Sequence, residues 1–307
     1  MFDFWQTPEE SIDATSKSCF ALCKAEMNPC QPFFPVADST GRKMDVRASF
    51  APATKVALLW KICATSAALF TVVYTWVEAS TPSFYLAYLT YWSLVVAAFY
   101  LFSSLVKTCR SEHLQQPPDE APWQIAFTWL LFSIAAHAEF FVTILYWVLV
   151  YNPDNSLTYS NVMPHGGMLV LVWVDGFVIN RIPCRWQHWW GAVVPFEAAW
   201  IFWSVLHSTL FDIGNPDAND GDDNDDAIYE AFDWKGDPGY CVILSLLVLF
   251  VAGPALYLVM WLWSWYKWPF CCRTNRRRYL DASAYPKRDE NRPSADVESV
   301  SIWDKFW

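Results

Sequence analysis

Thr90 and His165 each lie in a long apolar stretch, and they are residue types that form a nucleophile and its base. A threonine hydroxyl is a weak nucleophile until a neighbouring base takes its proton. An imidazole is the side chain that most often serves as that base. The two residues together are a candidate nucleophile–base dyad. The alternative is structural, because Thr and His inside apolar helices also bond the backbone or join neighbouring helices.

The segment around His165 reads Asn161-Val-Met-Pro164-His165-Gly166-Gly167. We expect a helix to begin at Pro164, because proline lacks an N–H and the first turn leaves that group unbonded in any case. The free N–H groups of a first turn stabilise an oxyanion, and two glycines let a substrate approach the backbone closely. The segment is therefore the expected binding surface for a reacting carbonyl group.

Other ionisable residues within the apolar stretches complete the candidate set, because charges inside a membrane are costly and commonly functional. Glu139, His207 and Thr90 are expected at about the depth of His165, so one site can contain them. Asp175 lies ten residues after His165, about 15 Å along a helix, so Glu139 or Asn161 is the better candidate to orient the imidazole. Lys61, near the end of the first stretch, is expected to extend its amine to the membrane surface.

Six apolar stretches hold these residues, and each is close to the roughly 20 residues that cross a bilayer core. Hydrophobic residues make up 54% of the 307-residue chain and charged residues 17%, whereas soluble domains average about 25% charged. The sequence predicts an all-α integral membrane protein, a six-transmembrane helical bundle. Its spans are 56–77, 84–106, 123–150, 164–182, 189–211 and 240–266.

The basic residues predict the orientation of this bundle. They gather before the first span and after the second, fourth and sixth, whereas the alternate loops contain only Lys235. The positive-inside rule then places both termini in the cytosol. The tails, 1–55 and 267–307, are polar and predicted to be disordered around one membrane domain, 56–266. The first span is expected to act as the targeting signal, to the plasma membrane or the endoplasmic reticulum without distinction.

The formal net charge of −10 argues against nucleic acid as a partner. Acidic residues crowd the loop 212–239, but counting from Asp217 puts Gly221 fifth rather than sixth, so the loop fails the EF-hand pattern.

No four-cysteine zinc spacing occurs, and we expect neither a metal nor a cofactor. Cys271 and Cys272 follow the last span beside basic residues and are candidates for lipidation or simply two free thiols. Protein partners cannot be read from the sequence.

Three segments resemble the androgen-induced six-pass membrane hydrolases and their rolling-stone relatives. The resemblance covers about residues 56 to 266, in matching order. Its motifs are Tyr88-Leu89-Thr90-Tyr91-Trp92-Ser93-Leu94, Asn161-x-x-x-His165 with Asp175 ten residues later, and Tyr229-Glu230-Ala231-Phe232-Asp233-Trp234 followed by Pro238-Gly239.

The resemblance to the hydrolase branch implies that Thr90 and His165 are a catalytic pair that cleaves fatty acid esters of hydroxy fatty acids, so a membrane lipid ester is the expected substrate. The rolling-stone branch is associated with myoblast fusion and implies a non-catalytic role in adhesion, fusion or scaffolding. Val162 and Gly166 stand where the hydrolases often have His and Thr. A transporter is disfavoured, because the membrane acids are scattered in depth and no internal repeat is visible.

Overall fold

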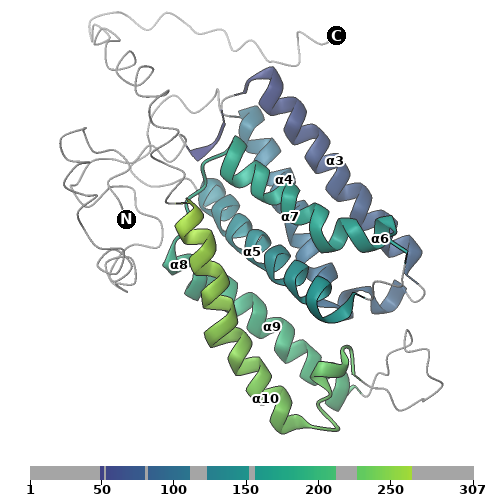
Figure 1. Ribbon diagram of the computed structural model, residues 1–307. Helices are drawn as coiled ribbons and strands as arrows, with labels where there is room; N and C mark the ends of the chain where they lie inside the picture. The colour runs from purple at the N-terminus through teal and green to yellow at the C-terminus, as the bar shows by residue number, and fades with distance from the viewer. Residues whose placement is uncertain are drawn as a thin grey trace, which may run out of the picture. The chain divides into compact units, whose positions relative to one another are not determined.

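The computed structural model describes residues 49–51, 53–79, 82–110, 123–151, 156–211 and 227–264. Within these ranges the chain is helical and contains no strand. The prediction of an all-α fold is confirmed for these residues, and the six apolar helices suggest an integral multi-pass membrane protein. Six helices are long and apolar enough to cross a membrane (Figure 1): Lys55–Glu78, Leu89–Arg110, Trp123–Val148, Tyr159–Ile179, Trp186–Leu210 and Pro238–Ser264.

The first three spans are nearly uninterrupted helices. The Thr54 hydroxyl caps the first of them by accepting the Ala57 N–H at 3.2 Å, which satisfies one of the donors that a helix start leaves free. Their bounds are α3 (Lys55–Glu78), a 3₁₀ turn η2 (Pro82–Ala87), α4 (Leu89–Arg110), α5 (Trp123–Leu145) and a wide π turn η4 (Tyr146–Val150).

The last three spans are divided by wide turns, in which an N–H donates to the carbonyl five residues earlier instead of four. The fourth span consists of α6 (Tyr159–Val162), η5 (Met163–Gly167), α7 (Met168–Trp173) and η6 (Val174–Ile179). The fifth consists of α8 (Trp186–His188), η7 (Trp189–Val193), α9 (Val194–Val205) and η8 (Leu206–Leu210). The sixth follows a short 3₁₀ turn, η9 (Glu230–Phe232), and contains α10 (Pro238–Leu247) and η10 (Val248–Ala252) before it ends at Ser264.

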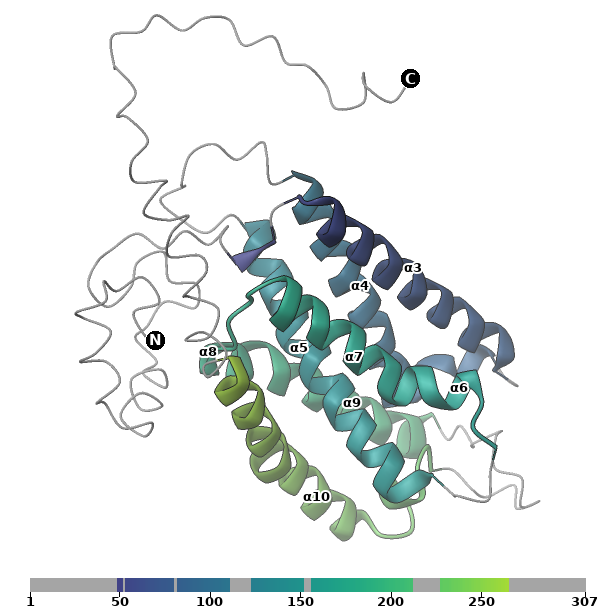
Figure 2. The same cartoon turned by 45° about the horizontal axis from the view of Figure 1, so that its top comes forward.

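The helix α5 is the centre of the bundle, since 72% of its membrane window is buried. Its alanines explain this position: Ala135 and Ala136 are fully buried and leave room for neighbouring helices to approach closely. Helices α4, α5 and α7 pack against one another, and they lie side by side in both cartoon views (Figure 1 and Figure 2). These three helices supply half of the residues of the main buried cluster, which also extends to Trp189 and Tyr257 of the last two spans.

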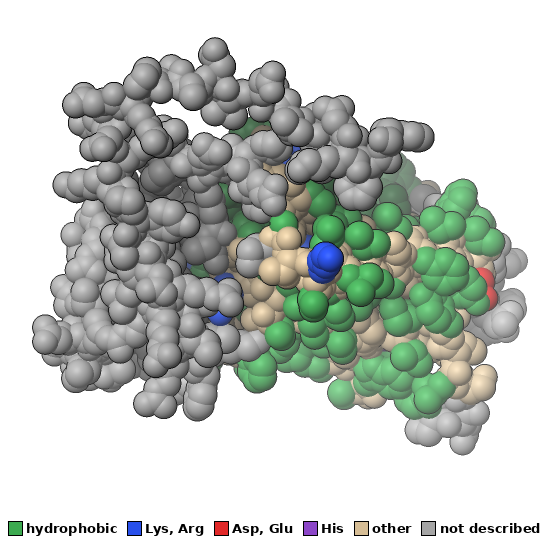
Figure 3. All heavy atoms as spheres, turned by 90° about the horizontal axis from the view of Figure 1, so that it is seen from above, with side chains coloured by type: hydrophobic (Ala, Val, Ile, Leu, Met, Phe, Trp, Pro, Cys, Tyr) green, Lys and Arg blue, Asp and Glu red, His purple; other side chains and the backbone are tan. Residues whose placement is uncertain are grey.

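Large apolar side chains point outward from the bundle, which is the arrangement expected in a hydrocarbon solvent. Phe99, Phe202 and Ile243 are about 60% exposed (60%, 63% and 60%). Figure 3 shows hydrophobic side chains covering much of the described part of one face. In water, contiguous apolar surface of this kind would drive association, so the surface composition agrees with the six spans.

The bundle has two chemically different ends, which we name by their residues. The basic end is where α3 begins at Lys55 and α4 ends at Arg110, and the acidic end is where α3 ends at Glu78. Residues 49–51, predicted to be part of the first tail, are bonded to the basic end: the Ala51 N–H donates to the Asn180 side chain at 3.1 Å. The tails before residue 49 and after residue 264, including Cys271 and Cys272, lie outside the described residues, as does 212–226 of the acidic loop.

Candidate functional site

Thr90 lies in the first turn of α4, at the acidic end. The prediction that the second span begins near Phe84, which would put Thr90 about six residues inside a helix, is wrong. A continuous helix would use the carbonyls of Leu86 and Ala87 to accept the N–H groups of residues 90 and 91. Instead, the indole of Trp92 donates to the Leu86 carbonyl at 2.6 Å, and the indole of Trp200 donates to the Ala87 carbonyl at 3.1 Å. The helix therefore starts at Leu89.

His165 lies at a break within the fourth span rather than in its first turn as predicted. The span begins earlier, at Tyr159, because that tyrosine is held by α3: its hydroxyl bonds the Thr71 hydroxyl at 2.8 Å. Pro164 removes one helical N–H, and the backbone at His165 leaves helical geometry with φ −108° and ψ 20°. The His165 carbonyl accepts the Trp147 indole N–H at 2.6 Å instead of a helical donor.

The His165 ring is half-buried and stacks flat on Tyr146, with ring centroids 3.6 Å apart and an interplanar angle of 3°. Its Nδ1 atom is buried and has no hydrogen-bond partner. Gly166 lies beside the Trp147 indole, where an added Cβ would be in ordinary contact at 3.7 Å. The break thus gives an imidazole with an unused nitrogen, held by two aromatic side chains of η4.

Two further residues of this segment have partners of their own. The Asn161 amide donates to the Ser156 carbonyl at 3.4 Å, so in this structure it does not orient His165. A Cβ on Gly167 would lie 2.4 Å from the Met163 sulfur, so this glycine makes room for a flexible side chain. The N–H groups expected to form an oxyanion site lie at the break after Pro164, five residues beyond the helix start at Tyr159, where His165 and Gly166 leave helical geometry.

Glu139 is fully buried in α5, and neither of its carboxylate oxygens has a hydrogen-bond partner. The polar side chain that faces this carboxylate is Ser93 of α4. The Ser93 hydroxyl, however, donates to the Thr90 carbonyl at 2.8 Å. A buried polar atom without a partner is rare in native proteins, because its desolvation is not compensated. Glu139 therefore requires an explanation other than stability.

Helical spacing places Thr90, Glu139 and His165 at one junction. Thr90 shares a face of α4 with Ser93 and Leu94, both fully buried. Glu139 and Tyr146, seven residues apart, share the face of α5 that turns toward α4 and the fourth span. His165 contacts that same face through Tyr146. No hydrogen bond joins the Thr90 hydroxyl to the His165 ring among the bonds of these described residues.

The rise along each helix gives the relative depths of these groups. Thr90 lies three residues, roughly 4.5 Å, closer to the acidic end than Ser93, which marks the level of Glu139. Tyr146 lies seven residues, roughly 10 Å, closer to the acidic end than Glu139. The Thr90 hydroxyl is therefore between the unpartnered carboxylate and the Tyr146–His165 stack in depth.

A second polar cluster occupies the basic end of the same three-helix interface. The Lys61 amine lies 2.9 Å from one Asp175 oxygen, and both side chains are fully buried. The expectation that Lys61 extends to the membrane surface is wrong, because Asp175 offers it a charged partner within the bundle. The other Asp175 oxygen accepts bonds from Tyr100 at 2.8 Å, Ser104 at 2.7 Å and Asn180 at 2.9 Å. Asp175 belongs to this network and not to the site of His165.

A third cluster lies on the opposite face of α5. His137 Nε2 is 2.8 Å from a Glu197 oxygen of α9, and the second Glu197 oxygen has no hydrogen-bond partner. Along α5, the Ser133 hydroxyl bonds His188 at 3.0 Å.

His207, predicted to join the site of His165, is buried against Phe84 of η2, with ring centroids 5.5 Å apart. The sequence alone did not pair any of these side chains.

Sequence reasoning missed Tyr229 as a site residue, although the motif that begins with it had been noticed. Its hydroxyl lies within hydrogen-bonding range of the backbone N–H groups of Leu89 and Thr90 and of the Thr90 hydroxyl. The signal was the aromatic residue of the loop 212–239, but only the tertiary structure brings it to the start of α4.

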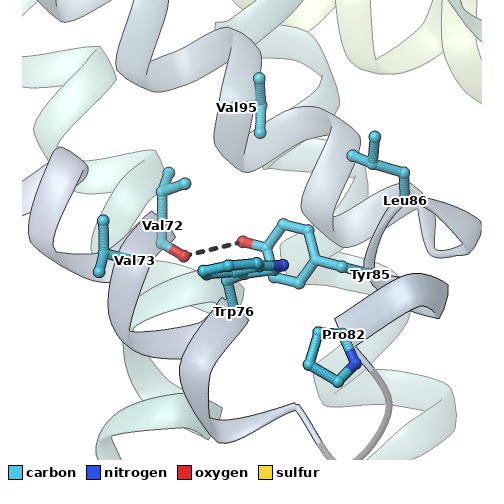
Figure 4. Close-up of a pocket in the computed structure, with 7 residues that line it drawn as sticks. All are labelled: Val72, Val73, Trp76, Pro82, Tyr85, Leu86 and Val95. Atoms are coloured by element: carbon cyan, nitrogen blue, oxygen red, sulfur yellow. Dashed lines mark hydrogen bonds between the residues drawn. The ribbon is translucent and has the colours of Figure 1, made fainter.

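An apolar groove of about 310 Å³ lies beside η2 on the side of α3 (Figure 4). It is lined by Val72, Val73, Trp76, Pro82, Tyr85, Leu86 and Val95. The Tyr85 hydroxyl bonds the Thr75 hydroxyl at 2.8 Å and the Val72 carbonyl at 3.3 Å. Burial raises the pKa of Tyr85 to about 12, so this phenol is neutral at physiological pH.

Within the described ranges, no group of three or more His, Cys, Asp or Glu side chains is placed to hold a metal ion. The chain was compared with protein-family models, with curated proteins and with solved structures, and none of the three comparisons found a match.

Proposed function

We propose that the protein is a multi-pass membrane hydrolase of lipid esters, with Thr90 as nucleophile and His165 as base. Fatty acid esters of hydroxy fatty acids are the substrate class that the sequence resemblance implies. The observation that supports the proposal is a group of buried atoms without hydrogen-bond partners among α4, α5 and the fourth span: the Nδ1 of His165 and both oxygens of Glu139. Polar atoms left unsatisfied in a native structure commonly belong to sites that a ligand completes.

The reaction follows the pattern of covalent ester hydrolysis. The Thr90 oxygen attacks the ester carbonyl carbon, the carbonyl π pair moves to oxygen, and the Thr90 proton passes to His165. The tetrahedral intermediate expels the alcohol, which takes the proton from the imidazolium. Water then attacks the acyl-threonine by the same route and releases the fatty acid. No cofactor takes part in this sequence.

The His165 ring has to leave its stack on Tyr146 or receive Thr90 at its edge, because proton transfer needs about 2.6–3.2 Å between the two heavy atoms. Catalytic hydrogen bonds are often long before substrate binds and tighten in the complex. Glu139, roughly one turn below Thr90, is a fully buried polar neighbour of this pair, and we assign it a positioning role rather than a direct contact with substrate.

We further propose that both termini lie in the cytosol, as the distribution of basic residues indicates. The acidic end, and with it Thr90, then faces the lumen of the endoplasmic reticulum or the cell exterior. An acyl chain reaches the site sideways from the bilayer, so no aqueous channel for substrate is required. Reporter tags at the termini, tested for protease access in sealed vesicles, check this orientation.

The function is tested with purified protein in detergent and a fluorogenic long-chain acyl ester. We expect Thr90→Ala and His165→Ala to lower kcat at least about 10³-fold, because each removes a group from the covalent step. Thr90→Ser retains a hydroxyl and is expected to retain most of the activity. Thr209→Ala is the matched control: its hydroxyl is exposed and donates only to the Val205 carbonyl of its own helix, so turnover should not change.

The alternative is a non-catalytic membrane protein that acts in adhesion, fusion or scaffolding. One observation favours it: the Thr90 hydroxyl lies against Tyr229 and the His165 ring against Tyr146, so neither is directed at the other. Undiminished turnover in Thr90→Ala or His165→Ala, or no turnover in the folded parent protein, would establish this alternative over the hydrolase.

A further inference from the structure

The segment that precedes α10 is fixed to the acidic end of the bundle. Its Trp234 indole donates to the Ser204 hydroxyl of α9 at 3.0 Å, and its Phe232 ring meets Trp200 edge-on at 5.4 Å. Asp233 accepts the N–H groups of Lys235 and Gly236, which closes the turn into α10. These contacts hold the segment in one place instead of leaving it as a free loop.

This anchoring directs Tyr229 onto the start of α4. Its ring lies 5.8 Å from Trp200 on one side and 5.8 Å from Tyr88 on another. It also packs against the buried cluster of Leu89, Phe141, Val142 and Trp200. The Tyr229 oxygen lies within hydrogen-bonding range of the N–H groups of Leu89 and Thr90, which are left without helical acceptors because the helix starts there.

The Tyr229 phenol is a suitable donor at this position. Burial raises the pKa of Tyr229 to about 12, even though the bonds from Thr90 and Leu89 act in the opposite direction, so the phenol is neutral at physiological pH. Its oxygen accepts from α4, and a phenol that accepts in this way still has one O–H group with which to donate. A donor whose oxygen is itself hydrogen-bonded is polarised and becomes a stronger donor.

We propose that Tyr229 is a catalytic residue of the Thr90 site, whose hydroxyl donates a hydrogen bond to the oxyanion that forms when Thr90 attacks an ester. The inference rests on the proposed function, and it deepens that function by assigning the oxyanion donor to the segment before α10 instead of to the turn at Pro164. Tyrosine hydroxyls are among the groups that stabilise tetrahedral oxyanions in acyl transfer. The negative charge forms on the oxygen of the carbon that Thr90 attacks, two bonds from the Thr90 oxygen that Tyr229 already contacts.

The test is Tyr229→Phe, which removes the hydroxyl and retains the ring that packs between Trp200 and Tyr88. We expect kcat for the fluorogenic long-chain ester to fall about 10²–10³-fold, the usual effect of losing one oxyanion donor, with KM changed less than threefold. The matched control is Tyr240→Phe, at a 52% exposed tyrosine of α10, which should leave both constants unchanged. The thermal midpoint of each variant in detergent shows that it is folded.

Each outcome decides between specific possibilities. A folded Tyr229→Phe variant with parental kcat, or with increased kcat because the segment merely obstructs Thr90, overturns the inference, while Thr90→Ala and His165→Ala still report on the function. Loss of kcat in Tyr229→Phe together with retained turnover in Thr90→Ala overturns the proposed nucleophile, and the inference with it. Loss of kcat in all three variants, with KM preserved in Tyr229→Phe, supports the assignment.

Discussion

Two polar regions share one interface of the bundle and differ in how completely their atoms are bonded. At the basic end, Lys61 and Asp175 form an ion pair that Tyr100, Ser104 and Asn180 surround with further hydrogen bonds. At the acidic end, the Glu139 carboxylate and one nitrogen of His165 are buried without partners. Both regions lie among α4, α5 and the fourth span, and α3 adds Lys61 at the basic end, so one interface contains both a fully bonded and an incompletely bonded polar group.

The comparison shows that a buried polar side chain can either stabilise the fold or reduce its stability, depending on whether its atoms have hydrogen-bond partners. The saturated network holds helices together, because every charge that leaves water receives a partner. The unsaturated group adds no such stability and costs desolvation energy, so its retention points to chemistry. Variants of the two regions should therefore change different properties, and four predictions test this in order of decreasing effect.

The largest effect is expected from Lys61→Met, which leaves the buried Asp175 carboxylate without its counter-charge. We expect the free energy of unfolding to fall by about 3–5 kcal/mol, the usual cost of breaking a buried pair. The double variant Lys61→Met/Asp175→Asn should recover most of that loss. Reversible unfolding in detergent measures both. Lys107→Met is the control, since Lys107 at the basic end donates to the neutral Gln124 side chain. Equal stability of Lys61→Met and this control would refute the structural role.

Glu139→Gln should change turnover rather than stability. The substitution removes an unpartnered carboxylate, so we expect the free energy of unfolding to change by less than about 1 kcal/mol or to increase. Ester hydrolysis should fall about 10²-fold, or about 2.7 kcal/mol, because the site loses a buried carboxyl group that the amide does not replace chemically. Steady-state kinetics and unfolding of the same preparation measure the two quantities. A loss of stability comparable to that of Lys61→Met, with turnover per folded molecule unchanged, would show that Glu139 stabilises the fold and has no role in turnover.

Tyr85 tests whether a fully hydrogen-bonded side chain at the acidic end stabilises the fold, as the network at the basic end does. Its folded-state pKa of about 12 lies above the ordinary 10.0, so the fold favours the neutral phenol. The contribution to stability is complete below pH 10 and is lost as the pH rises toward 12, by up to about 2–3 kcal/mol. Tyr85→Phe should remove this part of the alkaline loss. Unfolding free energies at pH 9 and pH 11.5 measure it, and identical pH slopes for parent and variant would contradict the prediction.

The smallest effect is expected from Trp147→Phe, which deletes the indole bond to the His165 carbonyl. We expect a loss of about 1 kcal/mol in the free energy of unfolding, the net value of one hydrogen bond. If the bond also positions the imidazole, kcat falls several-fold while KM is retained. Trp190→Phe, at a 52% exposed indole of the fifth span, is the matched control. A larger effect in the control than in Trp147→Phe would show that the bond has no positioning role.

The sequence predicted the number and type of the spans well, because hydrocarbon thickness forces a long apolar run wherever a helix crosses. Observed helix ends differ from the predicted ends by up to about five residues. The largest errors are at the starts of the second and fourth spans, where side chains decide the outcome. Indole donors end the helical bonding before Leu89, and the Tyr159 hydroxyl fixes an early start of the fourth span on α3.

The candidate site stays a prediction. Helical spacing places Thr90, Glu139 and His165 at one junction, whereas Asp175 pairs with Lys61 and His207 packs against Phe84 of η2. Single-helix periodicity can place a residue on a face, but it does not say which other helix lies opposite. The pairing of Lys61 with Asp175 spans 114 residues, so no local pattern contains it. The contact of Tyr229 with Thr90 is equally remote in sequence and depends on a loop fold.

The wide turns of the last three spans have a consequence for how this chain tolerates change in length. His165, Asp175 and His207 each lie within one of them, and Glu197 follows another by one turn. Such a turn accommodates one surplus residue, which rotates everything beyond it by about 100° around the helix axis. Deletion of a single residue before such a turn would therefore rotate the following side chains about the helix axis and turn these polar groups toward the lipid. Whether they point inward depends on the number of residues in the span as well as on their types.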